Sequence, residues 1–363
     1  MPGDCQRKYR RAFQVYDQAV DIISCWQSFT KYSYSEYFED YYFDRFPTIS
    51  QPEGDNLTPD FSIYFDSSYG IIGEIKRTFP DDDQAFRNTL QQLVKYDNDL
   101  PLQTSSGDER VPECCDVLLL LSGSDAPQIG TRIQDFKEQG EITFESNLVV
   151  LRYQYNTTAD LSRYEFQRVP VVPDDFQDSV TAVSDEETLE YTMGEEGQYQ
   201  TMKSYPKHFA PTKVKKPICN DEPPAVYLAT ILWHKIFPNY LSDSEYREWR
   251  EGTAQKIIPI QTSVSEITRK FNQYLMNGTV RETWVRDSLE FLNIANLARD
   301  TDSGFEIKFR GIVRSVGNDN HQERAQDLDQ IEELAAIFIE RYCEYSDERQ
   351  VREGQASIDE FAG

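Results

Sequence analysis

The feature that most limits the fold is a run of five consecutive apolar residues, Val117 to Leu121, within the segment CCDVLLLLSG. The run is far shorter than the roughly 18 apolar residues that a membrane-spanning helix needs. A short apolar run of this kind is typical of a buried strand. A buried strand requires a sheet around it and other elements over that sheet, so the neighbouring patterns decide the fold class.

The patterns around this strand predict an α/β domain with a mixed sheet flanked by helices, because strands and helices alternate along the chain. Apolar residues that recur at three- and four-residue steps indicate the helices, and alternation indicates the strands. The expected elements are helices over 8–30 and about 33–45, strands over 61–65 and 71–78, a helix over 83–97, the strand 114–123, a helix over 129–139, and strands over 147–155 and 164–171.

Composition divides the chain after residue 172. Nine acids and no Lys or Arg occur between 172 and 200, so residues 173–224 are expected to form an acidic linker or long loop between a first domain, 1–172, and a second, 225–345. The second domain is expected to be mainly α, and residues 346–363 to be a flexible polar tail. The expected elements of the second domain are helices over 225–241, 263–275 and 279–297, a strand over 305–313 and a helix over 327–342.

The net charge argues against general affinity for nucleic acid or anionic membranes. The chain carries 37 Lys and Arg against 63 Asp and Glu, a formal charge of −26. Solubility, or adaptation to a salt-rich cytoplasm, explains such a charge without any special function. A nucleic-acid function therefore needs a local basic surface, or metal ions that neutralise the acids.

Cysteine and histidine placement argues against a disulfide framework and against a structural zinc site. The six cysteines are scattered without a CxxC pair, and His208, His234 and His321 are far apart. The N-terminus lacks an apolar stretch behind its charges, and no segment is long enough to span a membrane. We therefore expect a cytoplasmic protein with no membrane partner, in which carboxylates hold any metal.

One group of residues carries the pattern of a metal site. Pro59-Asp60 begins the first hairpin strand, and Glu74-Ile75-Lys76 lies in its partner. Glu74 and Lys76 are two residues apart, so they share one face of the strand, whereas Ile75 points to the other face, into the core. Antiparallel pairing can bring Asp60 beside them. Two carboxylates favour a hard cation such as Mg²⁺ (or Mn²⁺), which activates water and stabilises charge on a phosphodiester.

These residues resemble the PD-(D/E)XK nuclease superfamily, over roughly residues 30–172. The resemblance implies a restriction-endonuclease-like fold that hydrolyses phosphodiester bonds with Mg²⁺. Asp60, Glu74 and the Ile75 carbonyl correspond to metal ligands in that family, and Lys76 to the residue that positions or deprotonates the attacking water.

Two further parts of the family pattern have counterparts in this chain. An additional acid from a preceding helix corresponds to Glu36 or Glu39, and the choice stays open because Glu36 also fits a capping box with Ser33. Gln92 and Tyr96 match the Q-x-x-x-Y pattern of RecB-like members, in which these residues hold substrate or order the site. Four residues apart on a helix, they share one face.

The second domain resembles a winged helix-turn-helix, with Arg299 to Gly304 as the tip of the wing. Residues 263–316 contain eight basic and seven acidic residues, a net charge of +1, so the rest of the chain carries −27. The resemblance implies DNA contacts through the second helix of the pair, but winged helices also bind proteins. The candidate DNA-binding residues are Arg281, Thr283, Arg286, Lys308 and Arg310.

The C-terminal tail resembles a sliding-clamp-interacting peptide. Gln355, Ile358 and Phe361 match its pattern, although Ala362 stands where a second aromatic residue is typical. The sequence thus predicts a metal-dependent deoxyribonuclease in DNA repair or in antiviral defence against foreign DNA, with DNA, a sliding clamp and a second copy of itself as candidate partners. Two alternatives remain: a catalytically inactive DNA-binding regulator with the nuclease fold, and a protein-interaction scaffold that uses the winged helix.

Overall fold

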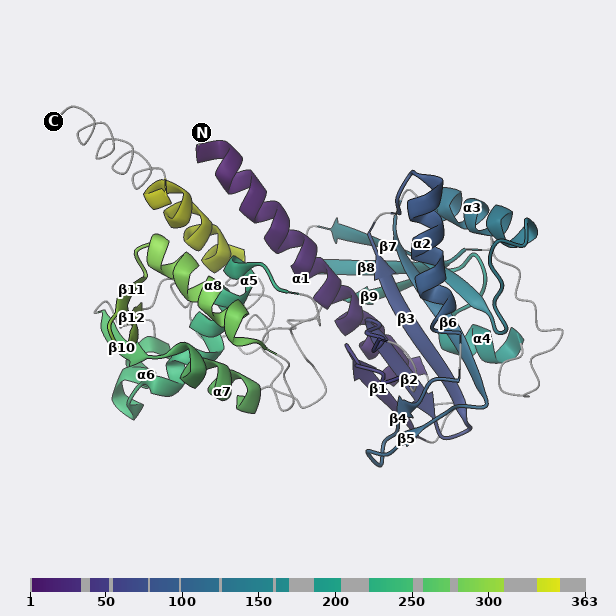
Figure 1. Cartoon of the computed structure of the whole chain (residues 1–363), viewed down its shortest axis with the longest axis horizontal. Coiled ribbons are helices and arrows are strands. Elements are labelled where there is room, and N and C mark those ends of the chain that lie inside the picture. Colours follow the sequence, from purple (N-terminus) through teal and green to yellow (C-terminus); the bar gives the residue numbers. More distant parts are fainter. Residues whose placement is uncertain are drawn as a thin grey trace. The chain divides into compact units, whose positions relative to one another are not determined.

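The computed structural model describes twelve segments of the chain, which form two compact units (Figure 1). We call Asp21–Tyr205 the sheet unit, and Met1–Val20 with Pro206–Gly363 the helical unit. The described segments are residues 2–33, 40–51, 55–77, 79–97, 99–123, 126–158, 161–169, 186–203, 222–250, 257–274, 280–309 and 332–346.

The sheet unit is built on a seven-stranded mixed sheet in the order β1-β2-β3-β6-β7-β8-β9. The central strands β3, β6 and β7 are parallel, and every other neighbouring pair is antiparallel. The predicted mixed α/β class is therefore confirmed. The strands are β1 (Tyr41–Arg45), β2 (Phe61–Phe65), β3 (Tyr69–Lys76), β6 (Cys114–Ser122), β7 (Leu148–Thr158), β8 (Leu161–Arg168) and β9 (Tyr199–Lys203), with a separate short pair, β4 (Leu102–Gln103) and β5 (Glu109–Arg110).

Helices pack on both faces of this sheet. On one face, α2 (Asp83–Val94) and α3 (Ala126–Glu138) place Leu93 and Phe136 in one buried cluster with Ile72, Leu119 and Val150 of the central strands. The other face meets the second part of α1 (Pro2–Ser33), where the Trp26 ring lies 5.3 Å from Phe166 of β8. A further helix, α4 (Glu186–Met193), precedes β9.

Two sequence-based expectations for this unit are wrong. The helix expected over about 33–45 is strand β1 over 41–45, because its aromatic residues pair across the ladder: Phe43 stacks on Phe61 at 5.2 Å, and Tyr41 lies 5.9 Å from Phe65. The linker expected over 173–224 contains α4 and β9, and β9 pairs with β8 as the last strand of the sheet. The acidic composition of this segment therefore gave no indication of the edge strand β9.

A buried carboxylate on β6 gives the sheet unit a distinctive pH dependence. Asp116 is fully buried and accepts hydrogen bonds from the Tyr69 hydroxyl (2.7 Å), the Asn147 amide group (3.0 Å) and the Asn147 backbone N–H (3.2 Å). Burial raises its pKa from 3.8 to about 6, although these hydrogen bonds oppose the rise. The folded state therefore binds a proton between about pH 4 and pH 6 that the unfolded state releases, and the contribution of Asp116 to stability falls as pH rises through this window.

We expect Asp116→Asn to stabilise the protein relative to wild type progressively as pH rises from 4 to 6, with no further change above that range. A difference of about two pKa units corresponds to roughly 3 kcal/mol, from which any loss of hydrogen bonding at Asn147 subtracts a constant amount. Urea unfolding of both proteins at several pH values measures this difference. A difference independent of pH would contradict it.

The helical unit contains a three-stranded antiparallel sheet in the order β10-β12-β11. Along the chain, β10 is followed by α7 and α8 and then by the β11–β12 hairpin. The helices expected over 263–275 and 279–297 and the strand expected over 305–313 correspond to α7, α8 and β12, whereas α6 and β10 were not predicted. The Glu266 N–H donates to Ser263 Oγ at 3.2 Å at the predicted start of α7. The elements are α5 (Ala225–Ile231), η3 (Leu232–Ile236), η4 (Phe237–Tyr240), α6 (Asp243–Arg250), β10 (Ile258–Thr262), α7 (Val264–Tyr274), α8 (Glu282–Ile294), β11 (Ala298–Thr301), β12 (Gly304–Phe309) and a helix over 332–346.

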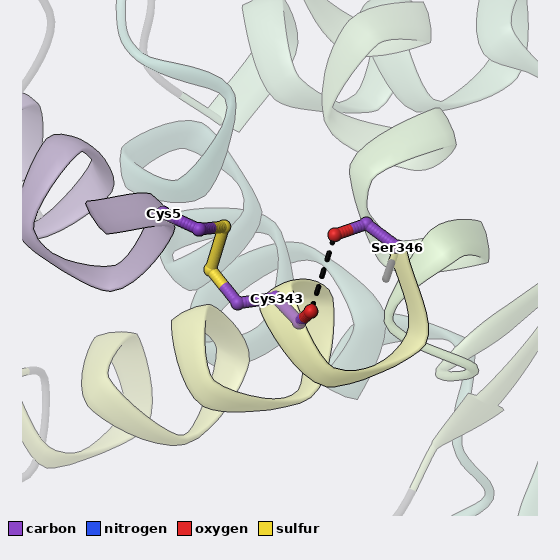
Figure 2. Close-up of a disulfide and its surroundings, with 3 residues drawn as sticks. All are labelled: Cys5, Cys343 and Ser346. Carbon is purple, nitrogen blue, oxygen red and sulfur yellow. Dashed lines mark hydrogen bonds between the residues drawn. A yellow bond between two sulfur atoms is a disulfide. The ribbon is translucent and has the colours of Figure 1, made fainter. Parts of the chain in front are cut away.

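The first part of α1 belongs to the helical unit rather than to the predicted first domain, 1–172. A disulfide joins Cys5 to Cys343 across 338 residues, with 5.8 Å between their Cα atoms (Figure 2). The Ser346 hydroxyl donates to the Cys343 carbonyl at 3.2 Å in the same helix (Figure 2). The Tyr9 ring lies 4.7 Å from the ring of Tyr342. This covalent link between the two ends of the chain is contrary to the expectation that the cysteines form no disulfide framework.

None of the described helices has the length and apolar character needed to cross a membrane.

Candidate active site

Asp60 and Glu74 face the same side of the sheet. Side chains alternate along a strand, so Asp60 shares its face with Tyr64, and Glu74 shares its face with Ile72. Tyr64 and Ile72 both lie in the buried cluster beneath α2. The two carboxylates therefore approach one another from neighbouring strands, on the face that α2 covers.

Hydrogen bonds hold Asp60 against β3. Its backbone N–H donates to the Gly73 carbonyl at 3.1 Å, and its Oδ2 accepts from the Ile75 N–H at 2.7 Å. A Cβ at Gly73 would overlap the ring of Phe61, so glycine at this position leaves room for that ring against β3. The aspartate is therefore fixed alongside the Glu74-Ile75-Lys76 segment by both its backbone and its side chain.

Glu74 is the centre of a connected chain of polar side chains. It is only 6% exposed, and its Oε1 accepts from Lys76 Nζ at 2.6 Å while its Oε2 accepts from the Tyr96 hydroxyl at 3.1 Å. Gln92 Nε2 donates to the Tyr96 hydroxyl oxygen at 3.2 Å. The structure thus brings together Glu74, Lys76, Gln92 and Tyr96, whereas Ile75, expected in the core, is only partly buried.

The Tyr96 hydroxyl is buried next to the charged Glu74. Burial raises the pKa of Tyr96 well above its usual value, and the charges of Glu74 and then Asp60 raise it further. The hydroxyl therefore keeps its proton at neutral pH and remains a donor to Glu74.

Tyr153 is a buried tyrosine affected by the charge of Asp60, but it lies on the other face of the sheet from Glu74, paired with Phe166 of the α1 face. It lies on β7 in register with Ser122, the last residue of β6, and is only 2% exposed. Burial raises the pKa of Tyr153 to about 12, and the charge of Asp60 contributes to the rise. Because Tyr153 is three residues from Val150 of the buried cluster under α2, its side chain points to the α1 face, so it is not part of the polar site around Glu74.

The donor atoms suit a hard cation but form an incomplete set. Asp60 and Glu74 supply carboxylate oxygens, the ligand type that Mg²⁺ prefers. Among the described residues, no group of three or more His, Cys, Asp or Glu side chains is placed to hold a metal ion. The predicted third acid, Glu36 or Glu39, lies outside the described residues. The residues present fit Mg²⁺ as two protein ligands of an ion that otherwise keeps its waters.

The candidate DNA-binding residues do not form one cluster. Arg281 is the N-cap of α8, with its guanidinium 5.2 Å from the Trp284 ring centre, and Thr283 and Arg286 are exposed on the first turns. Lys308 donates to Asn296, just beyond the opposite end of α8. Thirteen helical residues separate these ends by about 20 Å. Arg310 lies outside the described residues, as do Gln355, Ile358 and Phe361.

The exposed surface of α8 carries more acidic than basic side chains, which is unfavourable for a helix that contacts DNA. Glu282, Asp287 and Glu290 are exposed together with Arg286. Acidic side chains beside the candidate contacts repel phosphates and weaken any approach of α8 to a DNA groove.

Comparison with known proteins found no relative. No protein-family model, no curated protein and no solved structure matches the chain.

Proposed function

We propose that the sheet unit is a Mg²⁺-dependent deoxyribonuclease of the PD-(D/E)XK type. The observation that carries the proposal is the meeting of Asp60, Glu74 and Lys76 with the Gln92–Tyr96 pair at one end of β3. These five residues are the ones that the family resemblance selected, and a mixed sheet with helices on both faces supports the proposal. The restriction-endonuclease-like fold and the place in DNA repair or defence are part of the same proposal.

In this proposal each side chain has a separate task. Asp60 and Glu74 hold the ion, which when bound supplies a Lewis acid for the phosphodiester and its attacking water. Tyr96, itself held by Gln92, orients Glu74 by donating to Oε2. The Lys76 ammonium lies against Glu74 Oε1, where it positions the water and meets negative charge that develops on the phosphate.

Incubation of the full chain with linear, circular and single-stranded DNA, in Mg²⁺, Mn²⁺ or EDTA, tests the proposal. We expect cleavage with either metal and none with EDTA. Cleavage of circles indicates an endonuclease, and a requirement for ends indicates an exonuclease of the RecB-like kind. Absence of cleavage of all three DNAs with both metals would contradict the nuclease assignment.

One observation favours a second candidate, a DNA-binding regulator that keeps the nuclease fold without cleaving. Both carboxylate oxygens of Glu74 already accept hydrogen bonds from Lys76 and Tyr96. If these bonds persist in the presence of metal, Glu74 is a structural residue. DNA binding that is insensitive to metal, without cleavage, distinguishes this candidate from the nuclease.

For the helical unit we propose a winged helix, on the order of its elements and the β10-β12-β11 sheet. The acidic exposed surface of α8 favours a protein partner over DNA for this helix. The sliding clamp and the homodimer remain predictions from the sequence resemblance.

A further inference from the structure

The beginning of α1 carries the most concentrated positive charge among the described residues of this acidic chain. Arg7, Lys8, Arg10 and Arg11 are all exposed on successive turns. With Asp4 as the acid in residues 2–11, four basic residues and one acidic residue give +3, against −26 for the whole chain. We call these four residues the basic cluster.

Three members of the basic cluster line a groove in the helical unit. The groove has a volume of about 720 Å³ and combines cations with an apolar wall. Val15, in that wall, is 37% exposed. The lining residues are Asp4, Arg7, Lys8, Arg11, Ala12, Val15 and Tyr16 of α1, with Glu222 and Pro224.

The spacing and chemistry of the groove fit a nucleic-acid strand. Arg7 and Arg11 are one helical turn apart, about 6 Å along the axis, so a strand that lies along α1 can contact both cations. A single strand carries apolar base faces next to charged phosphates, and this groove places Ala12 and Val15 beside its cations. Asp4 pairs with Arg7, which leaves Lys8 and Arg11 in the groove, with the exposed Arg10 adjacent in sequence, as the stronger phosphate ligands.

Covalent and aromatic contacts hold this part of α1 in place. The disulfide from Cys5 to Cys343 precedes the basic cluster (Figure 2). Within the basic cluster, the centre of the Tyr9 ring lies 5.7 Å from that of Phe291. After the cluster, the centre of the Tyr16 ring lies 4.5 Å from that of Tyr227. A helix anchored on both sides of its cations presents them in fixed positions, which lowers the entropy lost on binding.

We propose that the groove beside the basic cluster binds a single-stranded nucleic acid through its phosphates. The choice of nucleic acid rather than another polyanion rests on the proposed function, but the site itself lies in the helical unit and is independent of the catalytic residues. An acidic protein segment is the competing occupant, and the test below includes it.

The test is fluorescence anisotropy of a labelled 20-nucleotide single strand with the full chain in EDTA, so that cleavage does not interfere. We expect Lys8→Gln/Arg10→Gln/Arg11→Gln to weaken binding at least tenfold and to reduce the slope of log K against log salt by about 2, since each lost phosphate contact on a single strand removes roughly 0.7. The single variant Arg11→Gln is expected to reduce the slope by about 0.7.

A matched triple, Arg110→Gln/Arg247→Gln/Arg269→Gln on β5, α6 and α7, makes the same change in charge at exposed positions and is expected to change affinity less than twofold. Three results would overturn the proposal. Both triples could weaken binding equally, the Lys8/Arg10/Arg11 triple could bind as wild type, or equimolar polyglutamate could displace the strand. Thermal unfolding of each variant checks that the fold is kept. Groove binding is measured in EDTA and cleavage in Mg²⁺, so failure of the groove and failure of the nuclease site give different results.

Discussion

Asp60→Asn is expected to lower the rate of Mg²⁺-dependent DNA cleavage by roughly a thousandfold or more, since the site has few other charges that hold the ion. Asn keeps an oxygen that accepts from the Ile75 N–H, so the 2.7 Å contact that fixes this residue on β3 is preserved. The loss therefore reports the missing negative charge rather than a changed backbone. Initial rates on a labelled DNA with saturating Mg²⁺ measure it.

Asp66→Asn is the matched control, because Asp66 follows the other end of β2 and is exposed. Its cleavage rate is expected to equal that of wild type. Lys76→Ala is expected to reduce cleavage as severely as Asp60→Asn, and Lys76→Arg to restore part of it. Normal cleavage by Lys76→Ala would contradict the role assigned to the ammonium group.

Removal of the disulfide is the second change for which we expect a large effect. Cys5→Ser is expected to lower the free energy of unfolding by about 3–5 kcal/mol, because the bond closes a loop of 338 residues and restricts the unfolded chain. Reductant is expected to lower the unfolding midpoint of wild type and to leave that of Cys5→Ser unchanged.

Cys114→Ser is the control for this experiment, since Cys114 is a free, partly buried cysteine of the sheet unit. It is expected to unfold close to wild type and to keep the response to reductant. Detection of Cys5 and Cys343 as free thiols by mass spectrometry of the non-reduced protein, or a midpoint insensitive to reductant, would contradict the disulfide.

The fold was predictable where local patterns agree with the tertiary contacts. The apolar run at Val117 to Leu121 is a central strand, and its five side chains are all buried, as the pattern predicted. Strand β1 was missed because Tyr41, Phe43 and Arg45 are interpretable as either helix or strand, and pairing with β2 decides between them. β9 was missed because its pairing with β8 is a tertiary contact of an otherwise acidic segment.

The sequence predicted which of the described residues lie together in the candidate site, but not the hydrogen bonds that join them. The spacing of Asp60, Glu74 and Lys76 on paired strands, and of Gln92 and Tyr96 on one helix face, selects residues that the fold brings together. The bond from Tyr96 to Glu74 depends on how α2 packs over the sheet, which no local pattern determines.

Two other features were missed for similar reasons. The bond between Cys5 and Cys343 joins positions that no sequence spacing relates. The basic cluster was visible in the sequence as RKYRR, but its groove is formed partly by residues near Pro224.

Binding of Mn²⁺ is the measurement that tests most directly whether Asp60 and Glu74 hold a divalent ion together. Titration of the full chain with Mn²⁺, followed by electron paramagnetic resonance of the free ion, counts the ions bound with and without each carboxylate. We expect at least one ion on the wild type that is absent from both Asp60→Asn and Glu74→Gln and is retained by Asp66→Asn. Equal binding of Mn²⁺ by all four proteins, or no binding by the wild type, would contradict a shared metal site and with it the proposed nuclease.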